Sequence, residues 1–323
     1  MSQFPYQFQS YQFASPQAGP RLLISGAVHG DETCGTQAIR RIIQEFESGA
    51  LLLKCGLVTF VPVTNAKAYA QQSRFGDRNL NRCLQPTTEV LEFEDAVANW
   101  LCPLMAQHEI LLDLHSFRDA GQAFAMMGPE DNQGTIEPFT QAREEEAFAL
   151  CLGVQRYVDG WLGTYSRWLS THGKSDQWKF GVGTTEYMRS VGGRALTLEC
   201  GSHLDPHAPE VAYRAIRNAL HHYGLLDFAQ ATDITAARAQ AEMLSLYHVV
   251  DRLHENDEFS RDWRSFDTLK AGDQIGTRAD GTAVLAEIDG YIVFPDTHAQ
   301  VGTEWFYLAR RTERLRKTKK TDI

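Results

Sequence analysis

An apolar stretch that ends abruptly in polar side chains does most to constrain this chain. Residues 22–28 are apolar or small, which is typical of a strand buried in a parallel sheet. His29, Gly30, Asp31 and Glu32 follow at once. An imidazole and a carboxylate three residues apart, just past the end of a strand, can turn toward one point. They would supply two of the three ligands of a catalytic zinc site of the two-histidine, one-glutamate type, which leaves one position for water.

Strand and helix patterns alternate after this first stretch. Apolar runs at 57–63, 109–114 and 195–200 predict further strands. Apolar residues recur at helical spacing over 38–46, 90–104 and 209–219, and residues 144–154 also favour a helix. Residues 123–127 predict a short strand, whereas 160–190 show no clear periodicity and suggest loops near a site. The alternation indicates an α/β fold, with a sheet flanked by helices.

The residue pattern of the chain changes near residue 232. An Ala-rich stretch up to residue 244 predicts a connector helix, and short alternating runs with turn dipeptides follow, including Asp-Gly at 280–281 and 289–290. These features predict a small domain of β-hairpins. We therefore expect a catalytic domain over residues 1–235 and a β-rich C-terminal domain over 236–323, ending in a basic tail at 310–320.

Composition excludes several classes of protein. The 323 residues carry a net charge of -10, which argues against a nucleic-acid surface. The first residues show no basic or apolar signal region, and no apolar run approaches the roughly 20 residues of a membrane span. Six cysteines are scattered without a Cys-x-x-Cys pair, as expected for reduced thiols. We expect a cytoplasmic protein with no nucleic-acid or membrane partner. Assembly into a homo-oligomer is compatible with the sequence.

A third zinc ligand follows the strand predicted at 109–114. His115, like His29, comes directly after a buried strand, and ligand sites of α/β sheets lie at the carboxyl ends of the strands. Asp113 lies two residues earlier, so it points to the same side and can orient an imidazole. Alone, His115 could merely end its strand. Together with His29 and Glu32 it predicts one Zn²⁺ per chain.

A candidate general base ends the strand predicted at 195–200. Glu199 follows the apolar residues Ala195, Leu196 and Leu198. A glutamate on a surface strand needs no function, but an apolar strand makes a buried, tuned base the better interpretation.

The polar loop over residues 64–86 concentrates positive charge. Arg74, Arg78 and Arg82 lie within nine positions, interspersed with Asn79 and Asn81. Arginine offers a planar fork that binds carboxylates with two hydrogen bonds. The alternative is a solvated basic loop, although such loops also favour lysine.

As an ordered set, these motifs resemble the succinylglutamate desuccinylase/aspartoacylase family, zinc amidohydrolases related to the zinc carboxypeptidases. The resemblance spans most of residues 20–225 and implies a mixed, largely parallel sheet with a smaller β-rich domain. It implies His29, Glu32 and His115 as zinc ligands and Glu199 as the catalytic carboxylate. The other residues that carry it are Asn65, Arg74, the pair Asn81-Arg82, the run Asp113-Leu-His115 and the triplet Glu199-Cys-Gly201.

The resemblance also implies roles for the arginines. Arg74 would stabilise the oxyanion, while Asn81 and Arg82 would hold a substrate carboxylate. Arg189 is a looser match to a second carboxylate-binding arginine. The chain departs from the family in having Asn79 where an aspartate is usual, and residues 118–185 match no member, so the substrate is not identified.

The function that follows is a zinc-dependent hydrolysis of the amide bond in a small, anionic N-acyl amino acid. Zinc would activate water, and Glu199 would take the proton as water attacks the amide carbonyl. A carboxypeptidase-like or ester-cleaving hydrolase on the same site is the alternative enzyme. A degenerate zinc-binding module is the alternative without catalysis, but a structural zinc site would need four protein ligands and no Glu199.

Overall fold

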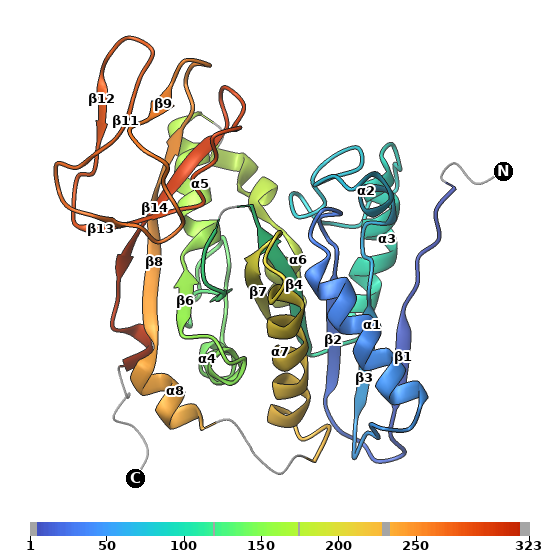
Figure 1. The fold of residues 1–323 in the computed structure, drawn as a ribbon. Coiled ribbons are helices and arrows are strands. Elements are labelled where there is room, and N and C mark those ends of the chain that lie inside the picture. The colour runs from blue at the N-terminus through green and yellow to red at the C-terminus, as the bar shows by residue number, and fades with distance from the viewer. Residues whose placement is uncertain (1–4, 119, 174, 228–232, 317–323) are drawn as a thin grey trace.

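A mixed sheet of eleven strands runs through the computed structural model, which describes residues 5–118, 120–173, 175–227 and 233–316 (Figure 1). In spatial order its strands are β1 (Tyr11–Ala14), β3 (Leu57–Val61), β2 (Arg21–Gly26), β4 (Ile110–Phe117), β7 (Arg194–Ser202), β5 (Phe124–Met126), β6 (Arg156–Asp159), β8 (Glu242–Asp251), β14 (Glu304–Arg311), β13 (Gly290–Val293) and β10 (Thr268–Leu269). A second sheet consists of β12 (Ala283–Leu285), β11 (Gln274–Thr277) and β9 (Glu258–Phe259). The predicted class, an α/β fold with a smaller β-rich part, is confirmed.

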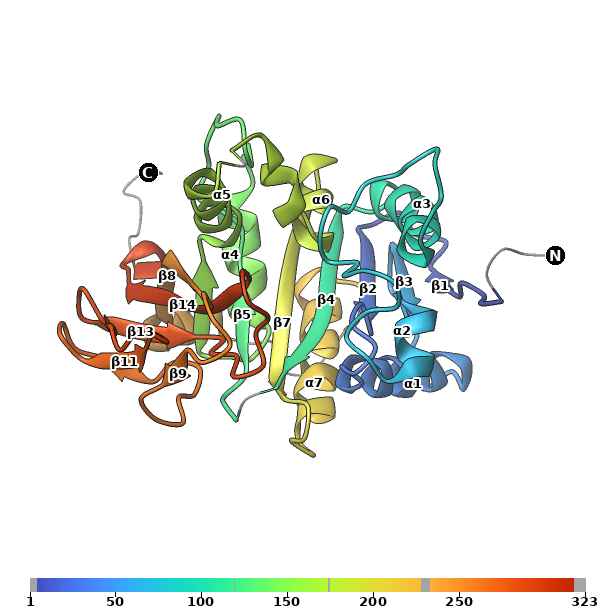
Figure 2. The same ribbon diagram turned by 90° about the horizontal axis from the view of Figure 1, so that it is seen from above.

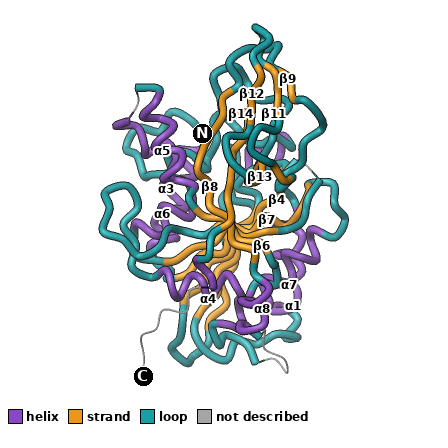
Figure 3. Tube along the Cα trace, turned by 90° about the vertical axis from the view of Figure 1, so that its left-hand side faces the viewer, coloured by secondary structure: helices purple, strands orange, loops and turns teal. Residues whose placement is uncertain are grey.

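Helices cover both faces of the sheet. They are α1 (Cys34–Glu47), α2 (Ala66–Gln71), α3 (Phe93–Ala106), α4 (Ala142–Cys151), α5 (Trp161–Thr171), α6 (Thr184–Ser190), α7 (Ala208–His222) and α8 (Ile234–Gln240), with 3₁₀ turns at η1 (Ser175–Gly181) and η2 (Arg314–Arg316). Figures 2 and 3 show α1 and α7 on one face of the sheet and α3, α5 and α6 on the other. Each face has its own apolar core, because one cluster joins α1, α4 and α7 to the sheet and a second joins α3 to the opposite side.

The central strands β3, β2, β4 and β7 are parallel to one another. Their carboxyl ends therefore meet at one edge of the sheet, where binding sites of α/β sheets lie. The strand register places predicted site residues opposite one another. Ser25 of β2 lies opposite Asp113 of β4, and His115 of β4 lies opposite Glu199 of β7.

The prediction of loops over residues 160–190 was wrong, because α5, η1 and α6 occupy most of that stretch. Helix α5 buries Leu162, Tyr165 and Leu169 on one face. Gly163 and Thr164 have low helix propensity, so the helical pattern is hard to recognise in the sequence. The polar loop over 64–86 likewise contains the short helix α2. Its N-cap is Asn65, whose side chain accepts a hydrogen bond from the backbone N–H of Ala68.

The β-rich part continues the main sheet rather than standing apart from it. Strand β8 is parallel to β6, and β14 pairs with β8 in the antiparallel direction. The domain division at residue 235 stays a prediction. The start of the expected basic tail is well packed, since buried Arg314 pairs with Glu146 at 2.9 Å and with Asp159 at 2.8 Å, and residues 317–323 lie outside the described part of the chain.

Across residues 5–118, 120–173, 175–227 and 233–316, no helix combines the length and the hydropathy needed to span a bilayer.

A buried ion-pair network ties α4, α6 and β7 together. The Arg189 guanidinium donates from Nε to Glu145 Oε2 at 3.0 Å, from Nη1 to Glu137 Oε1 at 2.9 Å and from Nη2 to the Ala195 carbonyl at 2.7 Å. The Glu145 carboxylate also accepts the backbone N–H groups of Gly128 and Ala195. Arg189 and Glu145 are almost fully buried, so each depends on the other for charge compensation.

We expect Arg189→Leu to lower the free energy of unfolding by about 3–5 kcal/mol, because the substitution leaves a buried carboxylate without its cation. Urea unfolding measures the change. Arg21→Leu is the matched control. Its ion pair with Glu109 is half exposed, and such pairs contribute about 1 kcal/mol or less. Equal stability of the two variants would show that the Arg189 network contributes little.

Candidate metal and catalytic site

His29 and Glu32 lie in the turn that follows β2, and His115 lies within β4. The turn is tightly packed against α2. A side chain at Gly30 would come within 2.0 Å of the Ala68 backbone, so only glycine fits where α2 crosses the turn. This close approach fixes the direction in which the two polar side chains leave the end of the strand.

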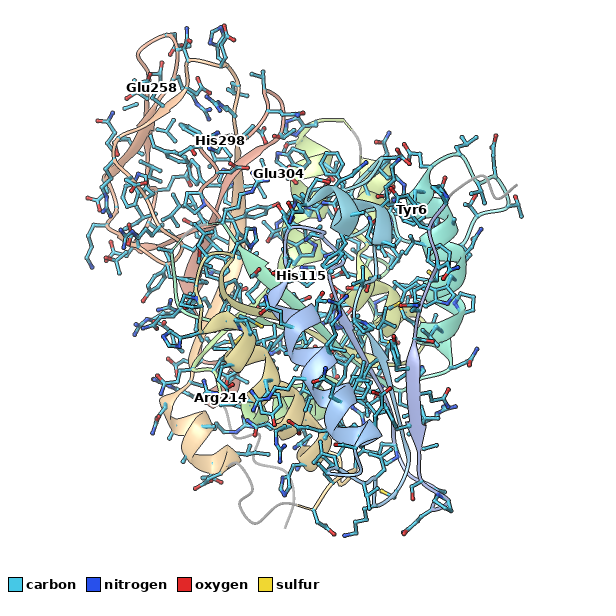
Figure 4. The ribbon with its side chains drawn as sticks, turned by 45° about the vertical axis from the view of Figure 1, so that its right-hand side comes forward. Tyr6, His115, Arg214, Glu258, His298 and Glu304 are labelled. Atoms are coloured by element: carbon cyan, nitrogen blue, oxygen red, sulfur yellow. The ribbon has the colours of Figure 1, made fainter. Side chains whose placement is uncertain are left out.

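Three predicted ligands converge at the carboxyl edge of the sheet. Glu32 lies between the two imidazoles, with Oε1 2.8 Å from His29 Nδ1 and Oε2 2.8 Å from His115 Nδ1. One ligand atom from each residue lies within 4.8 Å of the others, and all three side chains are buried. Figure 4 labels His115 at this position. Two imidazole nitrogens and a carboxylate oxygen form a donor set that suits Zn²⁺.

The outer nitrogen of each imidazole has a side-chain oxygen as its partner. His29 Nε2 lies 3.1 Å from Asn79 Oδ1, and His115 Nε2 lies 2.8 Å from Asp113 Oδ2. Asp113 is itself held by the hydroxyls of Ser25 at 2.7 Å and Thr184 at 2.5 Å. Such partners fix the ring orientation and tautomer of metal-binding histidines. Both Nδ1 atoms are thereby directed at Glu32, as a metal site at this position requires.

Burial and charge shift the pKa values of these groups in opposite directions. Burial, assisted by the positive charge of Arg74, lowers the pKa of His29 to about 4. Burial opposes the charge of Glu32, but the nearby His29 and His115 outweigh it and hold the pKa of Glu32 well below its usual value. Burial also opposes the charge of His115, yet Asp113 and Glu32 raise its pKa well above the ordinary value. The result is a neutral His29 beside an ionised carboxylate.

Glu199 is buried beside the three ligands without a hydrogen-bond partner for one of its oxygens. It lies opposite His115 in the register of β4 and β7, is 8% exposed, and its Oε2 has no partner among the described residues. Burial raises the pKa of Glu199 to about 8, and the negative charge of Glu32 adds to the shift. A carboxylate with such a pKa and a free oxygen suits the transfer of protons near neutrality.

Arg74 joins the same cluster. Its Nη1 donates to Glu32 Oε1 at 3.2 Å, and the side chain is 38% exposed. The guanidinium therefore lies where buried carboxylates meet solvent, so it can reach a bound molecule as well as Glu32. The structure brings together five of the predicted residues, namely His29, Glu32, Arg74, His115 and Glu199.

Asn81 and Arg82 lie in the loop beside the cluster. The Asn81 Oδ1 atom accepts the backbone N–H of Thr184 at 2.8 Å, which couples the loop to the start of α6. Arg82 donates from Nη1 to the Asn81 carbonyl at 2.9 Å, and its guanidinium lies over the rings of Trp161 and Tyr165, 4.8 and 5.5 Å from the ring centres. Arg82 is partly exposed, so part of its donor set remains accessible.

The structure does not bring Arg189 to this cluster. Its guanidinium faces Glu137, Glu145 and the Ala195 carbonyl, as described for the fold. The family resemblance implied that Arg189 binds a second carboxylate of a substrate, whereas its partners here are Glu145 of α4, Glu137 before α4 and the Ala195 carbonyl of β7.

Two residues of the site, Thr184 and His203, were not identified from the sequence. Thr184 holds Asp113, and no sequence signal marks it. His203 places Nδ1 2.8 Å from the Ser116 hydroxyl and leaves Nε2 buried without a partner among the described residues. With Asp31 and Glu32 it forms a second group of potential metal ligands. Its position four residues after Glu199 was the one available signal, since the turn after a strand that carries a site residue borders the same site.

Part of the chain matches the model of a known protein family. Residues 18–137 match the family model "Succinylglutamate desuccinylase/Aspartoacylase catalytic domain". A curated succinylglutamate desuccinylase of Burkholderia orbicola is 36% identical over 69 residues, which cover 21% of this chain and only 20% of that protein.

Solved structures share the fold over most of the chain. The succinylglutamate desuccinylase/aspartoacylase of Rhodobacter sphaeroides has a TM-score of 0.68 at 18% identity, covering 92% of this chain and 87% of the other. The succinylglutamate desuccinylase of Vibrio cholerae has a TM-score of 0.69 at 19% identity, covering 91% of this chain and 82% of the other. The ectoine utilization protein EutE (DoeB) of Ruegeria pomeroyi has a TM-score of 0.68 at 17% identity, covering 93% of this chain and 88% of the other. The chain is therefore similar to the succinylglutamate desuccinylase/aspartoacylase family, in sequence over residues 18–137 and in fold over most of its length.

Proposed function

We propose that this protein is a zinc-dependent deacylase that hydrolyses the amide bond of a small N-acyl amino acid bearing a carboxylate. The observation that carries the proposal is the unpartnered Glu199 Oε2, buried beside three convergent metal ligands. A structural metal site would leave no reason for a second carboxylate beside Glu32 that has a free oxygen and a raised pKa. The family match supports the reaction class.

His29, Glu32 and His115 would hold one Zn²⁺ per chain. The ion would supply a water of lowered pKa and polarise the carbonyl of the substrate. Asn79 and Asp113 keep both imidazoles oriented, so the site is organised before any ligand binds.

The protein's own residues would then carry the protons and orient the substrate. Glu199 Oε2 would take a proton from the attacking water and return it to the nitrogen of the leaving amine. Arg74 Nη would stabilise negative charge that develops on the carbonyl oxygen, since its guanidinium reaches both the cluster and solvent. Arg82, supported by Asn81, would bind the carboxylate of the substrate and hold the amide in reach.

The direct test is to incubate zinc-loaded protein with a panel of N-acyl amino acids and to follow amine release. Release of free amine from at least one carboxylate-bearing amide is expected. The absence of amine release across the panel from protein that holds zinc would overturn the proposed function.

We expect His29→Ala to lose both zinc and amide hydrolysis while the protein stays folded, because an eleven-stranded sheet does not depend on a catalytic ion. Metal analysis and circular dichroism check the two parts. His298→Ala, an exposed histidine of the β-rich part, is the control and should keep its zinc. Full zinc occupancy in His29→Ala would show that the ligand assignment is wrong.

Glu199→Gln keeps the shape of the side chain but cannot accept a proton. We expect normal zinc content with kcat reduced at least ~100-fold, within the usual range for a general base. Steady-state kinetics together with metal analysis measure both quantities. Turnover close to that of the wild type would make Glu199 a structural residue.

Arg82→Leu should raise KM for carboxylate-bearing amides. A charge-assisted hydrogen bond to a carboxylate contributes roughly 1.5–3 kcal/mol, which corresponds to about 10- to 150-fold. An amide that lacks the carboxylate provides the internal control, since its KM should not change. If KM rises equally for both substrates, Arg82 shapes the cleft rather than binding the carboxylate.

A further inference from the structure

The β-rich part contributes a carboxylate to the surroundings of Arg82. Glu304 is the first residue of β14, and its Oε1 lies 3.8 Å from Arg82 Nη2. Figure 4 shows Glu304 on the border between the β-rich part and the elements that carry His115. The Tyr307 hydroxyl donates to Glu304 Oε1 at 3.3 Å and thereby fixes the carboxylate on this side of its strand.

A short stretch of chain joins Arg82 to a residue that contacts a metal ligand. Asn79 Oδ1 contacts His29, and Arg82 follows Asn79 by three residues, which span at most about 10 Å of extended chain. A small N-acyl amino acid can therefore place its amide at the ligands and the rest of the molecule at Arg82 and Glu304. Both side chains remain partly exposed, 26% for Arg82 and 21% for Glu304, so a ligand can reach either one.

The subsite formed by Arg82 and Glu304 is close to electrically neutral, and aromatic rings form its walls. Trp161 and Tyr165 lie against the guanidinium, and Trp161 packs on Tyr307 with ring centres 5.3 Å apart. At 3.8 Å the ion pair is not a two-pronged contact, so the guanidinium keeps donors for a ligand. The faces of the aromatic rings attract cations and offer nothing to an anion.

A second carboxylate on the substrate would be repelled electrostatically at this subsite. Glu304 repels it, and Arg189, the other candidate cation, is engaged by buried carboxylates. A positively charged group would instead find Glu304 and the aromatic faces.

We propose that Glu304 is a specificity-determining residue that selects N-acyl amino acids with one carboxylate and one cationic group, that is, N-acylated diamino acids, over dicarboxylic ones. The carboxylate binds Arg82, and the cationic group faces Glu304. This inference rests on the proposed function, because it names the substrate class of the same site.

Three amides of similar length separate the effect of charge from that of size. They are Nα-acetyl-L-ornithine, N-acetyl-L-norvaline and N-acetyl-L-glutamate, with a cationic, a neutral and an anionic side chain. For the zinc-loaded wild-type protein, kcat/KM should fall in that order. A wild-type protein that prefers the glutamate derivative would overturn the inference without any variant.

Glu304→Gln should lower the ratio of kcat/KM for the ornithine derivative to that for the glutamate derivative about 10-fold or more, since attraction and repulsion are lost together. The control is Glu258→Gln, the same change at an exposed position of the β-rich part, and it should leave the ratio unchanged. If Glu304 only positions Arg82, all three substrates lose the same factor and the ratio stays constant, which would refute selection by charge.

Binding separates this inference from the proposed function. Isothermal titration of the same amides into zinc-loaded Glu199→Gln, with and without Glu304→Gln, gives affinities that do not require turnover. A charge preference in binding that Glu304→Gln abolishes supports the inference even where no amide is hydrolysed, and in that case only the proposed function fails. Equal affinities for all three side chains would refute it.

Discussion

A buried carboxylate between two imidazoles is the interaction on which the rest of the site depends. Glu32 is 2% exposed, and removing its charge from water is costly unless close partners compensate. His29 and His115 supply that compensation at 2.8 Å, while Arg74 and the backbone N–H of Ser116 add further donors. This requirement holds the ends of β2 and β4 together and leaves a donor set that a divalent cation can occupy.

Much of this arrangement could be predicted because it follows from strand ends. Apolar runs identify β2, β4 and β7, and a parallel sheet brings their carboxyl ends to one edge whatever the loops between them do. His29, His115 and Glu199 each lie at such an end, so short motifs were sufficient to bring them together. The prediction needed only the direction of the strands.

What sequence reasoning missed depends on contacts between distant segments. Arg189 looks the same in sequence whether it binds a substrate or a buried glutamate, and Glu145, which decides the matter, lies on α4 far along the chain. Helix α5 was missed because its apolar face is interrupted by residues of low helix propensity. Glu304 lies on a β-hairpin strand whose pattern says nothing about Arg82. In each case the information lies in packing rather than in periodicity.

The continuity of the sheet explains how a remote strand can shape the site. Strand β8 pairs with β6 on one side and with β14 on the other, so backbone hydrogen bonds set the position of β14 relative to the strands that carry His115 and Glu199. A separate domain on a flexible linker would leave Glu304 free to move away from Arg82. A strand of the shared sheet keeps the carboxylate within a few ångströms of the guanidinium, as selection by charge requires. The residues proposed for chemistry and Glu304, proposed for selection, thus come from different strands of one sheet.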